Sequence, residues 1–176
     1  MSRVLLRIPG NLHRAVQAHL LPEGGTSEEA GFIFARRSTA GEDEVFECID
    51  WLAIPPAGFV TRTDFHIELT DEMRAAVIKR AHDLDASLVE FHAHTGPWPA
   101  SFSPSDHLGF DEFVPHVWWR LKGKPYLAVV VTRTGFDSLI WLEDPRTPKH
   151  LDGIEVDGDV LEPTRLSPLS YIPYGQ

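Results

Sequence analysis

The stretch of residues 87–110 constrains the fold more than any other part of the sequence. It opens with an apolar run that has the residue types of a β-strand, and a loop rich in Gly and Pro follows. A helix is then expected to begin at Ser103 or Pro104, because Ser followed by Pro is typical of a helix N-terminus. Residues two apart on a strand share a face, so His92 and His94 are predicted to project together from the end of this strand.

The remaining patterns predict strands and helices in mixed order, which is typical of an α/β or α+β fold. The chain of 176 residues has no internal repeat and no convincing linker, so a single domain is expected to span residues 1–176. We expect a strand at a sheet edge over Val4 to Ile8, a loop over Pro55 to Thr61, helices over Asn11 to Leu20 and Asp71 to His82, and strands over Gly31 to Arg37, Glu44 to Ile54, Asp64 to Leu69, Tyr126 to Arg133, Asp137 to Leu142, Gly153 to Val156 and Val160 to Glu162.

Composition excludes several classes of function. The net charge of −10 and the absence of a Lys/Arg block argue against a nucleic-acid partner. Cys48 is the single cysteine, so the chain has no internal disulfide and no cysteine-based zinc cluster. No apolar run approaches the ~20 residues of a membrane helix, and the N-terminal apolar stretch is too short for a signal peptide. The sequence therefore predicts a soluble cytoplasmic protein with no membrane contact.

Asp106, near the start of the helix after the loop, is a candidate third ligand beside His92 and His94. Two imidazoles and one carboxylate leave a coordination position for water, which is the open arrangement of a catalytic zinc site. Such a water also needs a carboxylate base to take its proton. The serine and aspartate have a second interpretation, because Ser103 at an N-cap with an acid three residues later is a helix start in its own right.

The His-x-His pair, the loop and the Ser-x-x-Asp helix start together resemble the JAMM motif of the MPN-plus (JAB/Mov34/PAD-1) metalloproteases, in their stand-alone bacterial type. The resemblance covers a core from Glu28 to Leu142 and implies the MPN/JAB fold, a cytidine-deaminase-like three-layer arrangement with a mixed sheet flanked by helices. It also implies Zn²⁺ held by His92, His94 and Asp106. Thr95 stands where the family usually has Pro, and the loop to Ser103 is one residue longer than usual.

By this resemblance Glu28 is the general base and Ser103 donates a hydrogen bond to the developing oxyanion. Glu29 competes with Glu28, and Glu90 is a third candidate because it shares the strand face of the two histidines. We expect substrate contacts from Trp98 in the loop and from Phe59. His107 and His116 are expected to face solvent.

The family resemblance implies a peptidase that cleaves an amide or isopeptide bond at the C-terminal tail of a ubiquitin-like protein, as in deconjugation or precursor processing. E1- and E2-like enzymes would then be operon partners, and the substrate tail is expected to lie beside the His-x-His strand. Two alternatives stay open: a catalytically inactive MPN scaffold, and a zinc hydrolase of an unrelated peptide or small amide.

Overall fold

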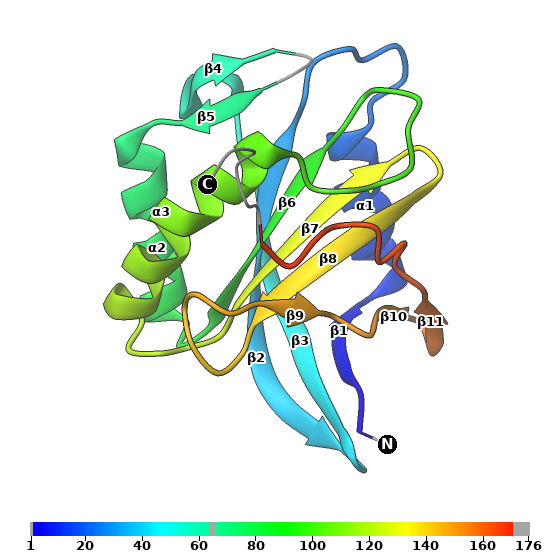
Figure 1. Ribbon diagram of the computed structural model, residues 1–176, viewed down its shortest axis with the longest axis vertical. Coiled ribbons are helices and arrows are strands. Elements are labelled where there is room, and N and C mark those ends of the chain that lie inside the picture. The colour runs from blue at the N-terminus through cyan, green and yellow to red at the C-terminus, as the bar shows by residue number, and fades with distance from the viewer. Residues whose placement is uncertain (1, 64–65, 171–176) are drawn as a thin grey trace.

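A nine-stranded mixed sheet forms the centre of the protein, seen here in a computed structural model that describes residues 2–63 and 66–170 (Figure 1). The strand order is β11-β10-β1-β3-β2-β6-β7-β8-β9, with parallel pairing of β1 to both β10 and β3 and of β6 to β7. The strands are β1 (Val4–Ile8), β2 (Ala30–Ala40), β3 (Asp43–Ala53), β6 (Ser87–Ala93), β7 (Tyr126–Thr132), β8 (Gly135–Trp141), β9 (Lys149–His150), β10 (Gly153–Val156) and β11 (Asp159–Leu161).

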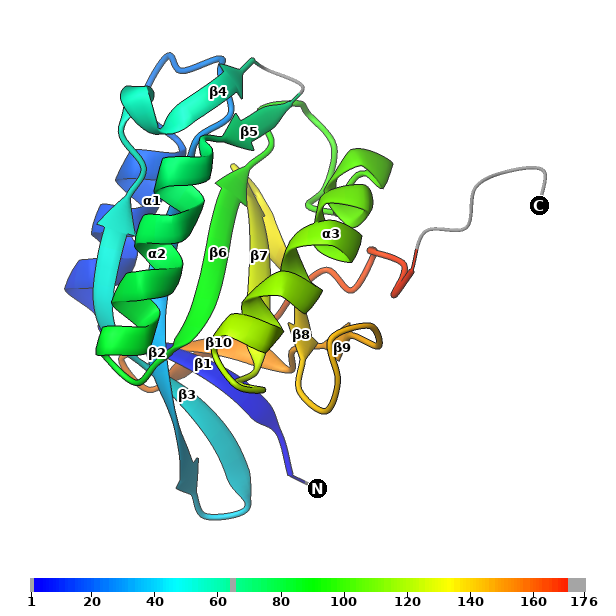
Figure 2. The same ribbon diagram turned by 90° about the vertical axis from the view of Figure 1, so that its left-hand side faces the viewer.

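Helices cover both faces of this sheet, which gives three layers (Figure 2). Helix α1 (Gly10–Leu20) packs on one face through Val16 and Leu20, in a core that also holds Phe91 and Val129. Helices α2 (Asp71–Asp83) and α3 (Pro104–Arg120) pack on the other face in a second core. The predicted mixed α/β (α+β) class is therefore confirmed. Within the described residues, no helix is long and apolar enough to cross a membrane.

The placement of β1 at a sheet edge was wrong. β1 lies inside the sheet, paired in parallel with β3 through Val4–Arg7 and with β10 through Leu5–Ile8. The strand is short, yet Leu6 and Ile8 are fully buried. The Arg7 side chain contacts Glu47 and Glu155 on the two neighbouring strands, so its charge is neutralised within the sheet.

The predicted loop over Pro55 to Thr61 contains ordered structure instead. A 3₁₀ turn, η1 (Pro56–Gly58), leads into β4 (Phe59–Arg62), which pairs in antiparallel fashion with β5 (Ile67–Leu69). The first two residues of the predicted strand over Asp64 to Leu69 lie outside the described residues. This two-stranded sheet stands beside the N-terminal end of α3, at the end of the main sheet where β6 stops (Figures 1 and 2).

Candidate metal centre

His92 and His94 are positioned by the backbone of the sheet. β6 lies between β2 and β7, and in this ladder His92 stands opposite Ala30 on one side and Val130 on the other. The amide of His94 donates to the carbonyl of Val131 at 2.9 Å, which extends the pairing just beyond the end of β6. Both imidazoles are therefore fixed at the end of a central strand, as the alternation predicts.

Asp106 is positioned by the start of α3. Ser103 is the N-cap, and its hydroxyl oxygen accepts a hydrogen bond from the Asp106 amide at 3.1 Å. In return, Asp106 Oδ2 accepts from the Ser103 amide at 2.8 Å, which completes a capping box. The helix start and the metal-site interpretation are thus compatible, because the cap itself turns the carboxylate toward the histidines.

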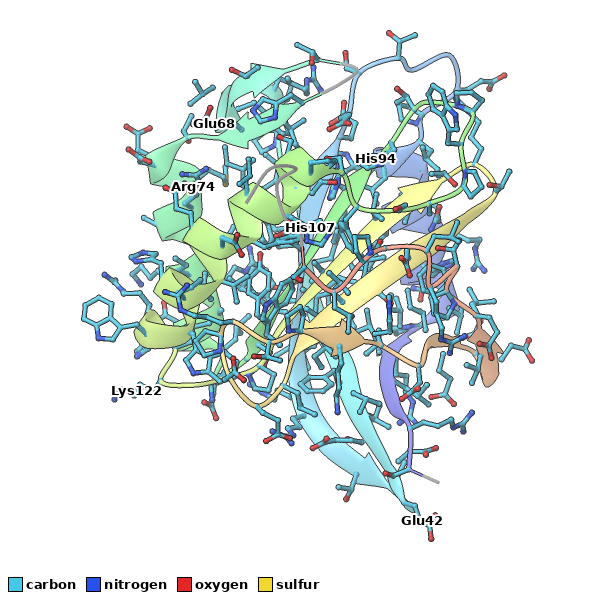
Figure 3. All side chains as sticks on the ribbon, in the orientation of Figure 1. Glu42, Glu68, Arg74, His94, His107 and Lys122 are labelled. Atoms are coloured by element: carbon cyan, nitrogen blue, oxygen red, sulfur yellow. The ribbon has the colours of Figure 1, made fainter. Side chains whose placement is uncertain are left out.

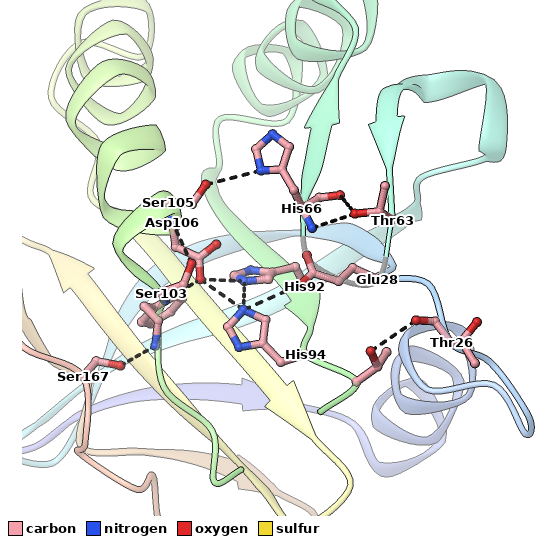
Figure 4. Close-up of polar contacts among 12 residues, drawn as sticks. Thr26, Glu28, Thr63, His66, His92, His94, Ser103, Ser105, Asp106 and Ser167 are labelled. Carbon is pink, nitrogen blue, oxygen red and sulfur yellow. Dashed lines mark hydrogen bonds and ion pairs between the residues drawn. The ribbon is translucent and has the colours of Figure 1, made fainter. Parts of the chain in front are cut away.

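The three side chains converge on one point (Figure 4). His92 Nε2 and His94 Nε2 lie 3.1 Å apart, and they lie 3.2 Å and 3.1 Å from Asp106 Oδ2, respectively. A tetrahedral ion with bonds of about 2.0–2.1 Å separates its ligand atoms by about 3.3 Å, so this nearly equilateral triangle has the size that such an ion requires. The cluster can therefore hold a metal ion.

The charges of these groups are strongly coupled. Burial disfavours the charged form of His92, but the carboxylates of Asp106, Glu90 and Glu28 together outweigh burial and raise the pKa of His92 to about 9. Burial likewise opposes ionisation of Asp106, and the two histidines overcome it and lower the pKa of this carboxyl. A cation at this point is stabilised by the ionised Asp106, and a metal ion competes there with the proton on His92.

Glu28 is the carboxylate beside this cluster, and Glu29 is held elsewhere. Glu28 is buried, its Oε1 lies 3.9 Å from His94 Nε2, and burial raises the pKa of its carboxyl. The side chain of Glu29 instead forms an ion pair with Arg62 and lies 3.9 Å from His19 Nε2. Of the two adjacent glutamates, only Glu28 has an ion-pair contact with a histidine of the cluster, His94.

Two hollows meet at the cluster. The larger, of about 600 Å³, lies beside the loop after β6 and is lined by Glu28, His94 and Ser103 and by Trp98, which is 74% exposed. The smaller, of about 310 Å³, lies between β5 and α3; its lining residues include His92, Asp106 and Glu90. We call the larger hollow the loop groove and the smaller one the helix pocket. Phe59 lines neither of them and packs against the core beneath α2 and α3.

Sequence reasoning misplaced His107. It was expected at the surface, yet it is buried, with its ring 6.4 Å from that of Phe102 and 5.9 Å from that of Phe110 (Figure 3). Burial lowers the pKa of His107, which favours the neutral imidazole. His116 is exposed, as expected. Sequence reasoning also missed His66 and Arg74, which line the helix pocket and carry no recognisable motif.

The chain matches no protein-family model, and no curated protein matches it.

Proposed function

We propose that this protein is a zinc-dependent peptidase of the JAMM (MPN-plus) type that cleaves an amide or isopeptide bond at the C-terminal tail of a ubiquitin-like protein. One observation carries the proposal: His92, His94 and Asp106 converge within 3.2 Å of one another, with Glu28 3.9 Å from His94. Two imidazoles and one carboxylate form the open ligand set of a hydrolytic zinc site. The MPN/JAB fold is part of this proposal, supported by the three layers and by the order of the motif residues.

The side chains have separate tasks in this proposal. When bound, zinc acts as a Lewis acid and makes hydroxide available at neutral pH. Glu28 accepts the proton of the attacking water and passes it to the leaving amine, a task that suits a buried carboxyl whose pKa is raised. Ser103 Oγ accepts from the Asp106 amide, so its hydroxyl hydrogen is available to the carbonyl oxygen of the substrate.

The position of Glu28 sets the direction of the substrate. Because Glu28 lines the loop groove and must reach the leaving amine, the amine part of the substrate occupies that groove, beside Trp98. The acyl part then occupies the helix pocket, between β5 and α3.

The expected location of the tail beside the His-x-His strand needs correction, because β6 is paired on both sides, by β2 and β7. β5 is a better template, since among the described residues only β4 pairs with it. An extended tail can add to such an edge through main-chain hydrogen bonds. E1- and E2-like enzymes as partners and a cytoplasmic location remain predictions from the resemblance.

The test compares wild type with Glu28→Gln, using ubiquitin-like fusions and unrelated peptides that end in Gly-Gly. We expect the variant to lose cleavage by about 10²–10⁴-fold while it retains stoichiometric zinc. Glu23→Gln is the matched control, because Glu23 is an exposed acid in the same loop. Full turnover by Glu28→Gln contradicts the role of Glu28. If the zinc-loaded wild type cleaves none of these substrates, the protein is better explained as a catalytically inactive scaffold. Equal rates on the ubiquitin-like fusions and on the unrelated peptides favour a zinc hydrolase whose substrate is an unrelated peptide.

A further inference from the structure

Glu90 occupies an unusual place on the central strand of the sheet. It lies two residues before His92, on the face that carries α2 and α3, and it is the one residue of β6 that is not fully buried. Its side chain is accessible because the helix pocket opens over it. A carboxylate therefore forms part of the floor of the pocket that adjoins the metal cluster.

This carboxylate is poorly satisfied by the protein. Tyr126 donates one hydrogen bond to Glu90 Oε1 at 2.6 Å, whereas an ionised carboxylate can accept about four. Among the described residues, no Arg or Lys side chain lies within ion-pair distance of Glu90. Arg74 lines the same pocket, but its guanidinium lies 3.9 Å from Asp71 and stacks 5.8 Å from the centre of the Phe113 ring. Glu90 is only partly exposed, and the positive charges of His92 and Arg74 act on it only from beyond ion-pair distance, so a ligand that brings a cation into contact with Glu90 gains by pairing with it.

The rest of the helix pocket has matching chemistry. Exposed carboxylates from β5 and α3, those of Glu68 and Glu112, lie at its rim. Figure 3 shows that Glu68 and Arg74 lie on the same side of the molecule, beside α3. The apolar part of the walls is formed by Phe32, Ile67, Leu69, Phe110 and Phe113, beside the polar side chains of His66 and Arg74. Apolar walls around an anionic floor suit the long methylene stem and charged head of Arg or Lys.

We propose that the helix pocket binds a basic side chain from the acyl part of the substrate, with Glu90 as its ionic partner. The inference rests on the proposed function, because it takes the acyl part to lie in this pocket. Glu90 stands two residues before His92, so about 7 Å of strand separates the two positions. An extended substrate covers that distance in about two residues. The basic residue therefore lies two or three residues before the scissile bond.

The first experiment is a peptide series with Arg, Lys, Met or Glu at each of the four positions before the scissile bond. For the zinc-loaded wild type we expect kcat/KM to be roughly tenfold or more higher for Arg or Lys than for Met at one position, with Glu the poorest. In Glu90→Gln this preference falls to within about threefold, because the amide keeps the shape but loses the charge. Gln also retains an oxygen that can accept from Tyr126, which preserves local structure. Glu162→Gln is the control, since Glu162 is an exposed acid that does not line the pocket.

The second experiment measures binding without catalysis. Fluorescence anisotropy in a Glu28→Gln background gives Kd for labelled Arg and Met peptides, with and without Glu90→Gln. Tighter binding of the Arg peptide that disappears with Glu90→Gln supports the pocket, even if wild type cleaves no peptide and the proposed function fails. Equal Kd values for Arg and Met peptides overturn the inference, as does an Arg preference that survives Glu90→Gln in protein with normal zinc content and normal unfolding.

Discussion

The guanidinium of Arg62 forms an ion pair with the carboxylate of Glu29 and so connects the β4–β5 sheet to the segment before β2. A second link lies beside it, because the Glu28 amide donates to the carbonyl of Thr63 at 2.8 Å. The Glu29 carbonyl in turn accepts from the Ala93 amide at 3.0 Å, next to His92. These contacts fix the backbone on both sides of the Glu28 side chain.

The Arg62 contact predicts a positioning role. Replacement of Arg62 by Met keeps the stem of the side chain and removes the ion pair, so we expect kcat to fall by about ten- to a hundredfold as Glu28 loses its alignment. Zinc content should not change, because Arg62 contacts none of the three ligands in the structure. Steady-state kinetics and metal analysis measure both effects. Arg133→Met, in the exposed β7–β8 turn, is the control; equal loss of kcat in both variants would contradict the assignment.

The two contacts of Ser103 predict that its replacement lowers stability and kcat by separate mechanisms. Ser103→Ala removes the N-cap of α3, which should lower the free energy of unfolding by about 1 kcal/mol. It also removes the donor to the substrate oxygen, which should lower kcat by about 10²–10³-fold. Thr70→Ala is a close control, because Thr70 caps α2 through the Met73 amide at 3.1 Å, outside both hollows. If both variants lose similar activity, Ser103 acts only as a cap.

The metal cluster could be predicted from local rules, whereas its surroundings could not. Strand alternation places His92 and His94 on one face, and the cap that starts α3 also orients Asp106. Each of these two rules applies to only a few consecutive residues. The preference for Glu28 over Glu29 came from the family resemblance, and its physical basis, the pairing of Glu29 with Arg62, joins residues 33 positions apart.

The main features that the sequence did not predict correctly are determined by tertiary packing. The short strand over Val4 to Ile8 was interpreted as an edge, because no local signal indicates that β10 returns to pair with β1. His107 is polar and near a helix start, yet rotation by one residue from Asp106 directs it to Phe102 and Phe110. Glu90 was predicted only as a third candidate for the base, because it shares a strand face with the two histidines. Its access to a pocket depends on β5 and α3, which are distant in sequence.

The raised pKa of His92 predicts how pH affects the metal-free protein. Its value of about 9 exceeds the ordinary 6.5, so the folded state binds this proton more tightly than the unfolded state. The resulting stability is fully present below about pH 6.5 and is lost as pH rises through about 9. Urea unfolding of chelator-treated protein at several pH values measures it. His92→Gln should lack this dependence, and an identical pH profile in the variant would contradict the assignment.

The same proton predicts the pH dependence of metal binding. Zinc requires a neutral imidazole, so it must displace the proton from His92, and apparent zinc affinity should rise by up to about tenfold per pH unit toward pH 9. Calorimetry in buffers with different ionisation enthalpies measures the protons released at pH 7.5. Release of about one proton or more per zinc is expected. No release would mean that His92 is already neutral in the metal-free protein.

The close approach of the Trp51 ring to Gly31 predicts that a larger residue at this position destabilises the layer behind the metal cluster. A Cβ at this position would lie 2.1 Å from the Trp51 ring, which itself packs edge-on against His19 and Phe91 with ring centres 5.9 Å and 6.3 Å away. Gly31→Ala therefore displaces Trp51, and we expect the free energy of unfolding to fall by about 1–3 kcal/mol. Gly135→Ala is the control, because its Cβ would meet nothing within 4 Å. Unchanged stability of Gly31→Ala in urea would mean that Trp51 can leave its place at little cost.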